Sequence, residues 1–569
     1  MDITISGTKA IMKSAFAEGT LNQLQKANLE IKSIQIETDA DKISQLSTEI
    51  EAKFLAEQIN IKNGDNAIKL NDFKLNGNRI DHNFWDNMEL RIKQANYDNR
   101  ELSLVISDFH LSQDQHSEKT GRLDTKTVFK MNGLKDKEMD NKKEYNIGNL
   151  LFDVRATING DNNTIAFKTL YDLFSQNGSI DRYIFKYNPK LHFLKFDSKN
   201  LDFVGSRNKF ACDNLLIETE GATKKDVYTN NSELKILNFG FFDKQGNLEF
   251  DKFSFQNNMK FYPKFYEKFL KVIEEHNRFS NSEVIDSLYG FTKTIDFQNR
   301  FMVSNLSFYL NKKEDSLKLS EGSIETDFSF DDGVGNISFR PIIALSNLKA
   351  LQETVQIKIP VENLKQQLNI KIKSVDLRAF EGLLKNIENP DTEARVDLAN
   401  QAIKNFIKAK PEASIQFEVS TQDGPSIDLM VSYGLNGELP KDFTVAPVFY
   451  GKEVHDNELR KALIDTSVLR INLLIKEQEK LISILNRMQG QGFGEALLEQ
   501  FNEYFVVEDK NMRTELMLQG DKLSVNGSAN PSLQEVFDLL VKSPKKKAEL
   551  EELYDLDSVI KNFEKAKEA

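Results

Sequence analysis

Hydrophobic residues recur along this chain in one fixed spacing, with apolar side chains at positions 1, 3, 6 and 8 of an eight-residue stretch. On a helix, these offsets scatter around the axis. On a strand, the first two positions share a face and the last two share a face, but the three-residue step between the pairs breaks the period of two. The nine copies are Leu29-Ile31-Ile34-Ile36, Ile68-Leu70-Phe73-Leu75, Leu104-Ile106-Phe109-Leu111, Tyr145-Ile147-Leu150-Phe152, Phe210-Cys212-Leu215-Ile217, Leu234-Ile236-Phe239-Phe241, Leu248-Phe250-Phe253-Phe255, Phe301-Val303-Leu306-Phe308 and Ile343-Leu345-Leu348-Ala350.

The three-residue step predicts a β-bulge in each of these strands. One extra residue at the step would return all four apolar side chains to a single face and would bend the strand. We therefore expect bent strands that each carry one apolar face. Asparagine and aspartate are frequent at the step, at Asp72, Asp108, Asn149, Asn214, Asn238, Asn305 and Asn347.

Amphipathic stretches predict helices between and after the strands. The clearest is 263–279, with apolar side chains on one side and charged side chains on the other. The strand copies begin at uneven intervals of 14 to 65 residues, whereas a solenoid or propeller needs a nearly constant period. The predicted fold class is α+β, with large bent antiparallel sheets, amphipathic helices packed on them and an elongated body. Further helices are expected at 8–27, 169–176, 283–289, 377–387, 392–409, 477–488 and 495–504, and hairpins at 414–431 and 516–525.

Four regions are expected, because 569 residues exceed one ordinary core. Residues 1–260 are predicted to be mainly β, and 261–410 to mix strands and helices. Residues 411–530 are predicted to form a C-terminal α+β region, and 531–569 a helical tail.

The net charge of −12 argues against a nucleic-acid-binding protein, because phosphate binding needs a concentrated basic surface. No stretch of eighteen apolar residues is present, so no membrane span is expected in this chain. The start, Met1-Asp2-Ile3-Thr4, has neither the basic end nor the apolar run of a signal peptide. We therefore expect either a cytosolic protein or one whose targeting segment is missing here.

Candidate chemistry is sparse in this sequence. The single cysteine, Cys212, occupies an apolar strand position and is expected to be buried and inert. His110 and His116 lie close together with Asp114 between them, but their spacing matches no standard metal site, so we expect a polar loop that follows a strand. Asp331-Asp332-Gly333 is expected to be a turn rather than a calcium loop.

No catalytic motif was recognised, so the chain is predicted not to be an enzyme. Catalytic, cofactor-binding and metal-binding residues are each predicted as none, and no cofactor is expected. The sequence does not indicate which residues bind a ligand, so these are unknown. The apolar face of the strands is the one collective feature above background. It is interpreted either as an ordinary sheet core or as a binding surface.

Two segments near the carboxyl end resemble the closing motif of the YdgA-like family of Gram-negative envelope proteins, whose function is unknown. The first segment is 499–508, and the second is Leu516 to Gly527, which ends in Leu523-Ser524-Val525-Asn526-Gly527. The passage from strand to helix at 468–488 is also similar. The resemblance implies a periplasmic body tethered to the inner membrane by one N-terminal helix, which this sequence lacks. It implies no catalytic residues.

Three functions follow from these observations as hypotheses. The first is a non-enzymatic periplasmic protein with an envelope assembly, scaffold or chaperone-like role, whose partner is another envelope protein. The second is binding of lipid or another apolar ligand in a groove lined by the sheet. The third is a cytosolic interaction protein.

Overall fold

The computed structural model of this chain forms two compact units. Unit 1 comprises Met1–Gly333 and Phe339–Ile357, and unit 2 comprises Val334–Ser338 and Lys358–Ala569. The division lies within the predicted middle region, 261–410. The structure describes residues 2–6, 9–14, 29–31, 34–39, 50–63, 65–81, 84–99, 102–117, 122–138, 143–159, 191–205, 208–274, 280–309, 316–348, 361–386, 390–421, 424–439, 441, 443–446, 462, 464–501, 504–520 and 522–530.

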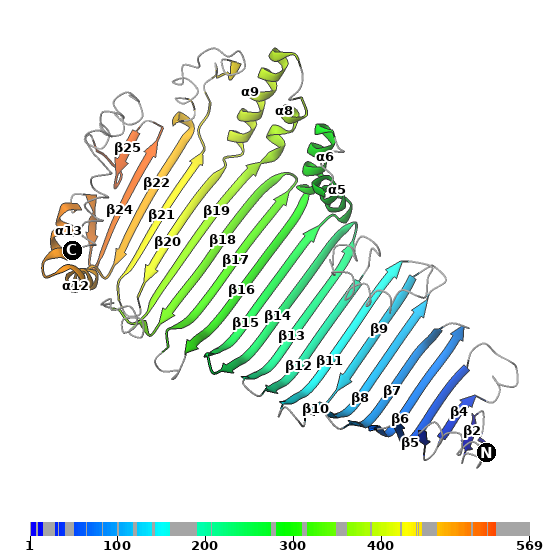
Figure 1. The fold of residues 1–569 in the computed structure, drawn as a ribbon. Helices are drawn as coiled ribbons and strands as arrows, with labels where there is room; N and C mark the ends of the chain where they lie inside the picture. Colours follow the sequence, from blue (N-terminus) through cyan, green and yellow to red (C-terminus); the bar gives the residue numbers. More distant parts are fainter. Residues whose placement is uncertain are drawn as a thin grey trace. The chain divides into compact units, whose positions relative to one another are not determined.

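Unit 1 is an antiparallel sheet of long strands, several of them 17 residues in length. From β11 onward, each strand pairs with the next along the chain through to β17. These strands lie side by side in Figure 1. The strands are β1 (Asp2–Ser6), β2 (Lys9–Ser14), β3 (Leu29–Ile31), β4 (Ile34–Asp39), β5 (Ile50–Asn63), β6 (Asn66–Asp81), β7 (Phe84–Asp98), β8 (Leu102–Ser117), β9 (Arg122–Met131), β10 (Gly133–Glu138), β11 (Lys143–Asn159), β12 (Leu191–Val204), β13 (Asn208–Lys224), β14 (Val227–Asp243), β15 (Gly246–Phe261), β16 (Thr294–Tyr309) and β17 (Lys318–Asp331), followed by β18 (Val334–Ser346), which contributes to both units.

The prediction of large antiparallel sheets is confirmed, but α+β describes the fold only loosely because helices are few among the described residues. One predicted helix is wrong in part. Residues 9–14, inside the predicted helix 8–27, form strand β2, which is hydrogen bonded to β1 on one side and to β4 on the other. Ladder hydrogen bonds on both sides outweigh the local helical pattern, because a short helix without tertiary packing is only marginally stable.

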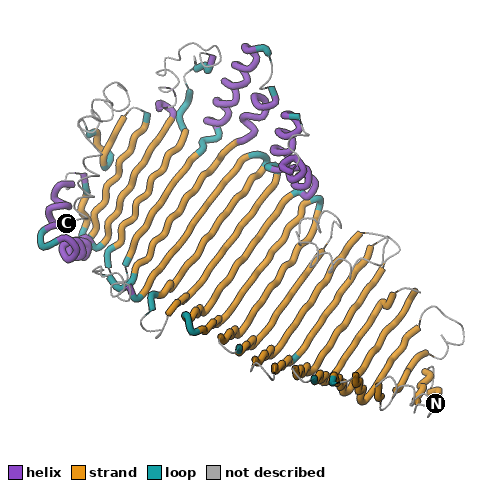
Figure 2. The backbone as a smooth tube through the Cα atoms, viewed as in Figure 1, coloured by secondary structure: helices purple, strands orange, loops and turns teal. Residues whose placement is uncertain are grey.

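Two helices of unit 1, α5 (Pro263–Glu274) and α6 (Asn281–Phe291), connect β15 to β16. They lie at the ends of these strands (Figure 2). Helix α6 begins with a capping box, in which Ser280 and Glu283 satisfy each other's backbone amides. The ring of Phe269 in α5 stacks on the ring of Phe291 in α6, with 4.2 Å between the centroids. This aromatic contact packs the two predicted helices against each other.

Unit 2 repeats the antiparallel arrangement with shorter strands, which pair in the order β19, β20, β21, β22, β24 and β25. Both predicted hairpins are present. Helices α8 and α9 lie at one end of the strands, and α12 and α13 lie at the other (Figure 1). The elements are β19 (Leu364–Asp376), η3 (Leu377–Phe380), α8 (Glu381–Lys385), α9 (Thr392–Lys408), β20 (Glu412–Ser420), β21 (Ser426–Leu435), β22 (Ser467–Lys476), α12 (Gln478–Gln489), α13 (Phe493–Phe501), β23 (Val506–Glu508), β24 (Asn511–Gln519), β25 (Lys522–Val525) and β26 (Ser528–Ala529).

Helix α9 organises the described hydrophobic cluster of unit 2. The Asp391 carboxylate caps the helix by accepting from the amides of Glu393 and Ala394. Ala399 on its inner side packs in a buried cluster with Phe443, Val445 and Ala462.

Residues 169–176 and 531–569, which are predicted to be helical, lie outside the described residues. Among the residues that are described, no helix is long and apolar enough to cross a membrane.

Candidate binding faces of the two sheets

Asparagine and aspartate at the three-residue step adopt left-handed backbone. Asp72, Asp108, Asn238 and Asn305 have φ between 48° and 53°, and Asn347 has φ 61°. These two residue types tolerate this conformation best among residues with a Cβ, because their short polar side chains bond locally. Asn149 and Asn214, by contrast, are absent from the residues with positive φ. The Asn and Asp preference at the step therefore has a backbone cause in five of the seven predicted positions.

The steps of neighbouring strands face one another across the sheet. Between β14 and β15, Leu237 pairs with Lys252 before the step, and Phe239 pairs with Phe250 after it. The register is therefore the same on both sides, so neither strand gains a residue relative to the other. This corrects the predicted β-bulge, which would set two residues of one strand against one of its neighbour.

Hydrogen bonds between side chains connect the steps of adjacent strands. Asn238 Nδ2 donates to Asp213 Oδ2 at 2.7 Å, and Asn305 Nδ2 donates to Asp251 Oδ2 at 2.6 Å. Each pair joins a left-handed residue to an aspartate at the step of the preceding strand. The kinks are thus aligned from strand to strand rather than scattered through the sheet.

The apolar residues on the two sides of a step share one face, as predicted. Phe250 and Phe253 lie on opposite sides of the step in β15, yet their ring centroids are 6.2 Å apart. Phe250 also stacks on Phe239 at 4.6 Å, and Phe253 meets Phe301 edge to face at 5.1 Å. Side chains that stood on opposite faces of a strand could not make this connected set of contacts.

The apolar positions of one strand pair with those of the next, so they form a continuous surface, here called the apolar face. Its centre lies on β13 to β17. Two strands outside the nine copies, β5 and β7, carry the same spacing, and in β12 Ser198 takes one of the four positions. The apolar face is defined by Phe210, Cys212, Leu215, Ile217, Leu234, Ile236, Phe239, Phe241, Leu248, Phe250, Phe253, Phe255, Phe301, Val303, Leu306, Phe308, Leu319 and Ile324.

Several large side chains of the apolar face are open to solvent. Phe308 is 60% exposed, Ile324 42%, Ile217 40% and Phe255 37%. Most of the remaining members are half-buried, whereas an ordinary sheet core would bury them fully. An apolar surface of this kind is a candidate interaction site.

A row of uncharged polar residues crosses the same face beside the apolar side chains, and we call it the polar row. It consists of Thr219, Ser232, Asn257, Asn299 and Thr326, each paired with the next across adjacent strands from β13 to β17. All five residues are half-buried. The Thr219 and Ser232 hydroxyls are 2.8 Å apart, and Asn257 Nδ2 donates to Asn299 Oδ1 at 2.6 Å.

Toward the strand ends beyond the polar row, large side chains on the same face are fully buried. Tyr228, Phe261 and Ile295 are at most 1% exposed, and the rings of Tyr228 and Phe261 lie 5.2 Å apart. The three residues lie at or next to the ends of β14, β15 and β16, and α5 and α6 connect the same ends of β15 and β16 (Figure 1). The open apolar surface is thus bounded on one side by polar groups and a buried aromatic cluster.

Unit 2 has an apolar face of its own. Ile415 pairs with Val431, which pairs with Ile471 on the next strand. The neighbouring row contains Phe417, and the exposed fractions are 48% for Ile415 and 39% for Phe417. The alternation that predicted the hairpin at 414–431 therefore places apolar side chains on a surface rather than in a closed core.

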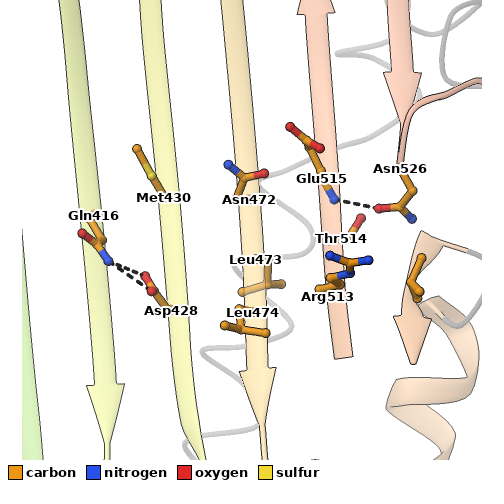
Figure 3. A pocket seen from close by; sticks show the side chains of 11 residues that line it. Gln416, Asp428, Met430, Asn472, Leu473, Leu474, Arg513, Thr514, Glu515 and Asn526 are labelled. Carbon is orange, nitrogen blue, oxygen red and sulfur yellow. Dashed lines mark hydrogen bonds between the residues drawn. The ribbon is translucent and has the colours of Figure 1, made fainter. Parts of the chain in front are cut away.

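The other face of unit 2 contains a depression of about 410 Å³ (Figure 3). Gln416 Nε2 donates to both carboxylate oxygens of Asp428 at 3.1 Å, and Arg513 Nη2 donates to Glu508 Oε1 at 2.7 Å. Its lining contains no histidine or cysteine, so these described residues offer no nucleophile with a neighbouring imidazole base. The lining residues are Gln416, Asp428, Met430, Asn472, Leu473, Leu474, Val506, Arg513, Thr514, Glu515 and Asn526.

Asn526 joins the two segments of the closing motif. Its Oδ1 accepts from the amide of Glu515 at 2.9 Å, while its Nδ2 donates to the carbonyl of Tyr504 at 2.9 Å. Its φ is 50°, and that of Gly527 is 78°. The Asn-Gly sequence is therefore required both by the turn and by the contact between the segments.

Cys212 is buried as predicted, with 3% of its surface exposed. Its thiol lies 3.2 Å from the carbonyl oxygen of Asn214. Burial raises the pKa of the thiol, so the thiolate is disfavoured. The side chain is part of the apolar face, and the neighbouring Asp213 carboxylate raises the pKa of the thiol further.

The predicted polar loop around His110 is wrong, because both histidines lie within strand β8, which continues to Ser117. His110 Nε2 is 2.9 Å from Glu89 Oε1, which also accepts from Arg91 Nε at 2.7 Å. Burial raises the pKa of Glu89, but hydrogen bonds from Arg91, His110 and Asn76 outweigh it and hold the pKa below its usual value. His116 instead pairs across the ladder with Asp124, away from this group.

Asp331-Asp332-Gly333 is a turn, as predicted. Asp332 has φ 46° and Gly333 has φ 83°, the two positive angles of a tight hairpin connection. No group of three or more His, Cys, Asp or Glu side chains that could hold a metal occurs in the part of the chain that the structure describes.

Sequence reasoning missed the polar row, because its members stand at strand positions that are apolar elsewhere on the face.

No protein-family model, curated protein or solved structure matches this chain.

Proposed function

We propose that this chain is a non-enzymatic protein that binds the acyl chains of lipids on its apolar face. The observation that carries the proposal is the exposure of large side chains such as Phe308, Ile324 and Phe255 on a surface continuous over many strands. Apolar burial is not directional, so a flexible acyl chain can cover such a surface without matching hydrogen-bonding groups. A folded protein partner would have to place complementary side chains at each position.

The burial of one acyl chain on the apolar face is sufficient for measurable binding. Each buried methylene contributes about 0.8 kcal/mol, so about ten buried methylenes contribute about 8 kcal/mol. Association costs at least about 4 kcal/mol, which leaves binding in roughly the millimolar range for one short chain. A longer chain, or two chains on one ligand, would bring the affinity to roughly micromolar.

We further propose that the protein works in the periplasm of a Gram-negative envelope, anchored to the inner membrane by a segment outside this sequence. The support is the resemblance of the closing motif, in which Asn526 holds the hairpin against Tyr504. An envelope location also suits lipid binding, because acyl chains are abundant there.

A second candidate function is an assembly, scaffold or chaperone-like role towards another envelope protein. The apolar face of unit 2 favours it, since Phe417 and Tyr433 are 39% and 45% exposed. Aromatic side chains of this kind are enriched at protein interfaces.

Two adjacent residues on opposite faces of β15 provide the test. Phe255 is on the apolar face and Gln256 is exposed on the other face, so Phe255→Asp and Gln256→Asp add the same charge to the two surfaces. We expect the purified full chain to bind a fluorescent long-chain acyl probe, Phe255→Asp to weaken binding at least tenfold, and Gln256→Asp to bind as the parent. Absence of probe binding to the parent, or equal loss in both variants, would refute lipid binding at this face.

A further inference from the structure

The polar row lies directly beside the most aromatic part of the apolar face. The pair Asn257 and Asn299 is two residues along the strands from the pair Phe255 and Phe301. We propose that the polar row binds the carbonyl-bearing linkage of a neutral acyl ester whose chain lies on the apolar face. This inference rests on the proposed function and specifies the ligand class.

Hydrogen-bonding capacity is unused at the centre of the polar row. Asn257 Nδ2 donates to Asn299 Oδ1 at 2.6 Å. Within the described part of the chain, the Asn299 amide group donates to no other residue, and Asn257 Oδ1 accepts from none. The pair therefore presents three N–H donors, two on Asn299 and one on Asn257, and the Asn257 side-chain oxygen as an acceptor to a ligand on this face.

The end of the polar row at β13 differs from its centre. Thr219 Oγ1 donates to Asn230 Oδ1 at 3.0 Å, and Asn230 Nδ2 donates to Ser232 Oγ at 2.8 Å. These three side chains satisfy one another, and Asn230 is only 1% exposed. Ligand contacts are thus expected at Asn257 and Asn299, not at the Thr219 end.

The absence of charge in the polar row determines whether it binds a carboxylate or a neutral ester better. All five members are neutral, and the positions that flank Asn257 and Asn299 on this face are Phe255, Met259, Phe297 and Phe301. A carboxylate placed there would lose hydration without gaining a cation, which is costly. An ester carbonyl loses much less hydration and can accept from the Asn299 amide. The row therefore favours a neutral ester over a free fatty acid.

The residues on either side of the polar row determine the direction in which the acyl chain of the ligand lies. Past the row, Phe261 and Ile295 are buried and leave no room for a ligand. In the other direction, the apolar run of β15 from Phe255 back to Leu248 extends about 23 Å at roughly 3.3 Å per residue, enough for a long acyl chain. The ester linkage consequently lies at the row, and the acyl chain runs from it across the aligned kinks.

Two ligands that differ only in the carbonyl provide the test. Monolauroylglycerol has an ester, and monododecylglycerol has an ether at the same place with the same chain length. Their affinities for the full chain are measured by titration calorimetry below their critical micelle concentrations. The parent protein should bind the ester about fivefold more tightly, as expected for one neutral hydrogen bond.

The variant Asn257→Leu/Asn299→Leu removes both amides, so neither is left without a partner. It should bind the two ligands equally. The matched control is Asn258→Leu/Gln298→Leu, because these two residues form the adjacent cross-strand pair on the opposite face. The control should retain the preference for the ester.

The outcomes separate the two proposals. Equal binding of ester and ether by the parent, or a preference that survives in Asn257→Leu/Asn299→Leu, overturns the inference and leaves acyl binding standing. Failure of the parent to bind either ligand overturns acyl binding itself, and the inference with it. The comparison on the parent needs no variant, so it holds even if the double variant does not fold.

Discussion

Asn238 offers the sharpest test of the aligned kinks. It has φ 49° at the step of β14, and its Nδ2 donates to Asp213 Oδ2 at 2.7 Å. A β-branched residue in left-handed backbone costs about 1–2 kcal/mol. The lost hydrogen bond lies at the surface, so it adds only about 0.5 kcal/mol. We expect Asn238→Val to lower the free energy of unfolding by about 2 kcal/mol.

Asn238→Gly separates the backbone effect from the hydrogen bond. Glycine adopts positive φ without steric cost but loses the side-chain contact, so the expected loss is below about 1 kcal/mol. Lys235→Val is a control for β-branching at an ordinary position of the same strand, and we expect no loss there.

The assay is equilibrium urea unfolding followed by the fluorescence of Trp85, the sole tryptophan, which lies in β7 of unit 1. With a urea dependence of about 3 kcal/mol/M, a loss of 2 kcal/mol shifts the midpoint by about 0.7 M. Equal midpoints for Asn238→Val and Asn238→Gly would refute the argument, because the left-handed backbone would then impose no requirement on the residue.

Three further predictions concern individual sites. Hydrogen bonds lower the pKa of the Glu89 carboxyl in the folded protein. The ionised carboxylate therefore contributes its full stabilisation above the pKa that Glu89 has in the unfolded chain. This stabilisation is lost as the pH falls through the lower pKa of the folded state. The stability difference between the parent and Glu89→Gln, measured by urea unfolding, should therefore shrink from about pH 6 to about pH 3; a difference independent of pH would contradict this. Cys212 is buried with a raised pKa, so a thiol reagent should label it only as unit 1 unfolds, and rapid labelling of the native protein would argue against its placement. Asn526→Ala should cost about 2 kcal/mol through the lost bonds to Glu515 and Tyr504 and the positive φ, with Asn526→Gly recovering part of the loss in thermal unfolding.

The alternation of apolar and polar residues predicted the strands and their faces, since Phe250 and Phe253 do lie on one side of β15. It did not predict how the step is accommodated. A bulge and an aligned kink require the same spacing in a single strand, and only the register of two strands distinguishes them. The asparagines at the step were a signal for left-handed backbone, because this residue type adopts positive φ more readily than most.

The candidate site was predicted only in outline. The sequence indicates a large apolar face, but exposure depends on what covers the face, and no local pattern encodes that. The polar row was hidden for a related reason. Asn257 and Asn299 are 42 residues apart in sequence, and each alone resembles an ordinary polar residue near a strand end. Strand pairing is what brings them together on the apolar side.

Acyl-chain binding requires one surface that is apolar, continuous across strands and accessible to a ligand. Photo-crosslinking of the full chain with a diazirine-bearing acyl chain, followed by mapping of the labelled residues by mass spectrometry, tests it most directly. We expect labels on Leu248 and Phe250 on one side of the kink in β15 and on Phe253 and Phe255 on the other side. Labels on Lys252 and Ser254 instead, or labels spread without alternation, would contradict it.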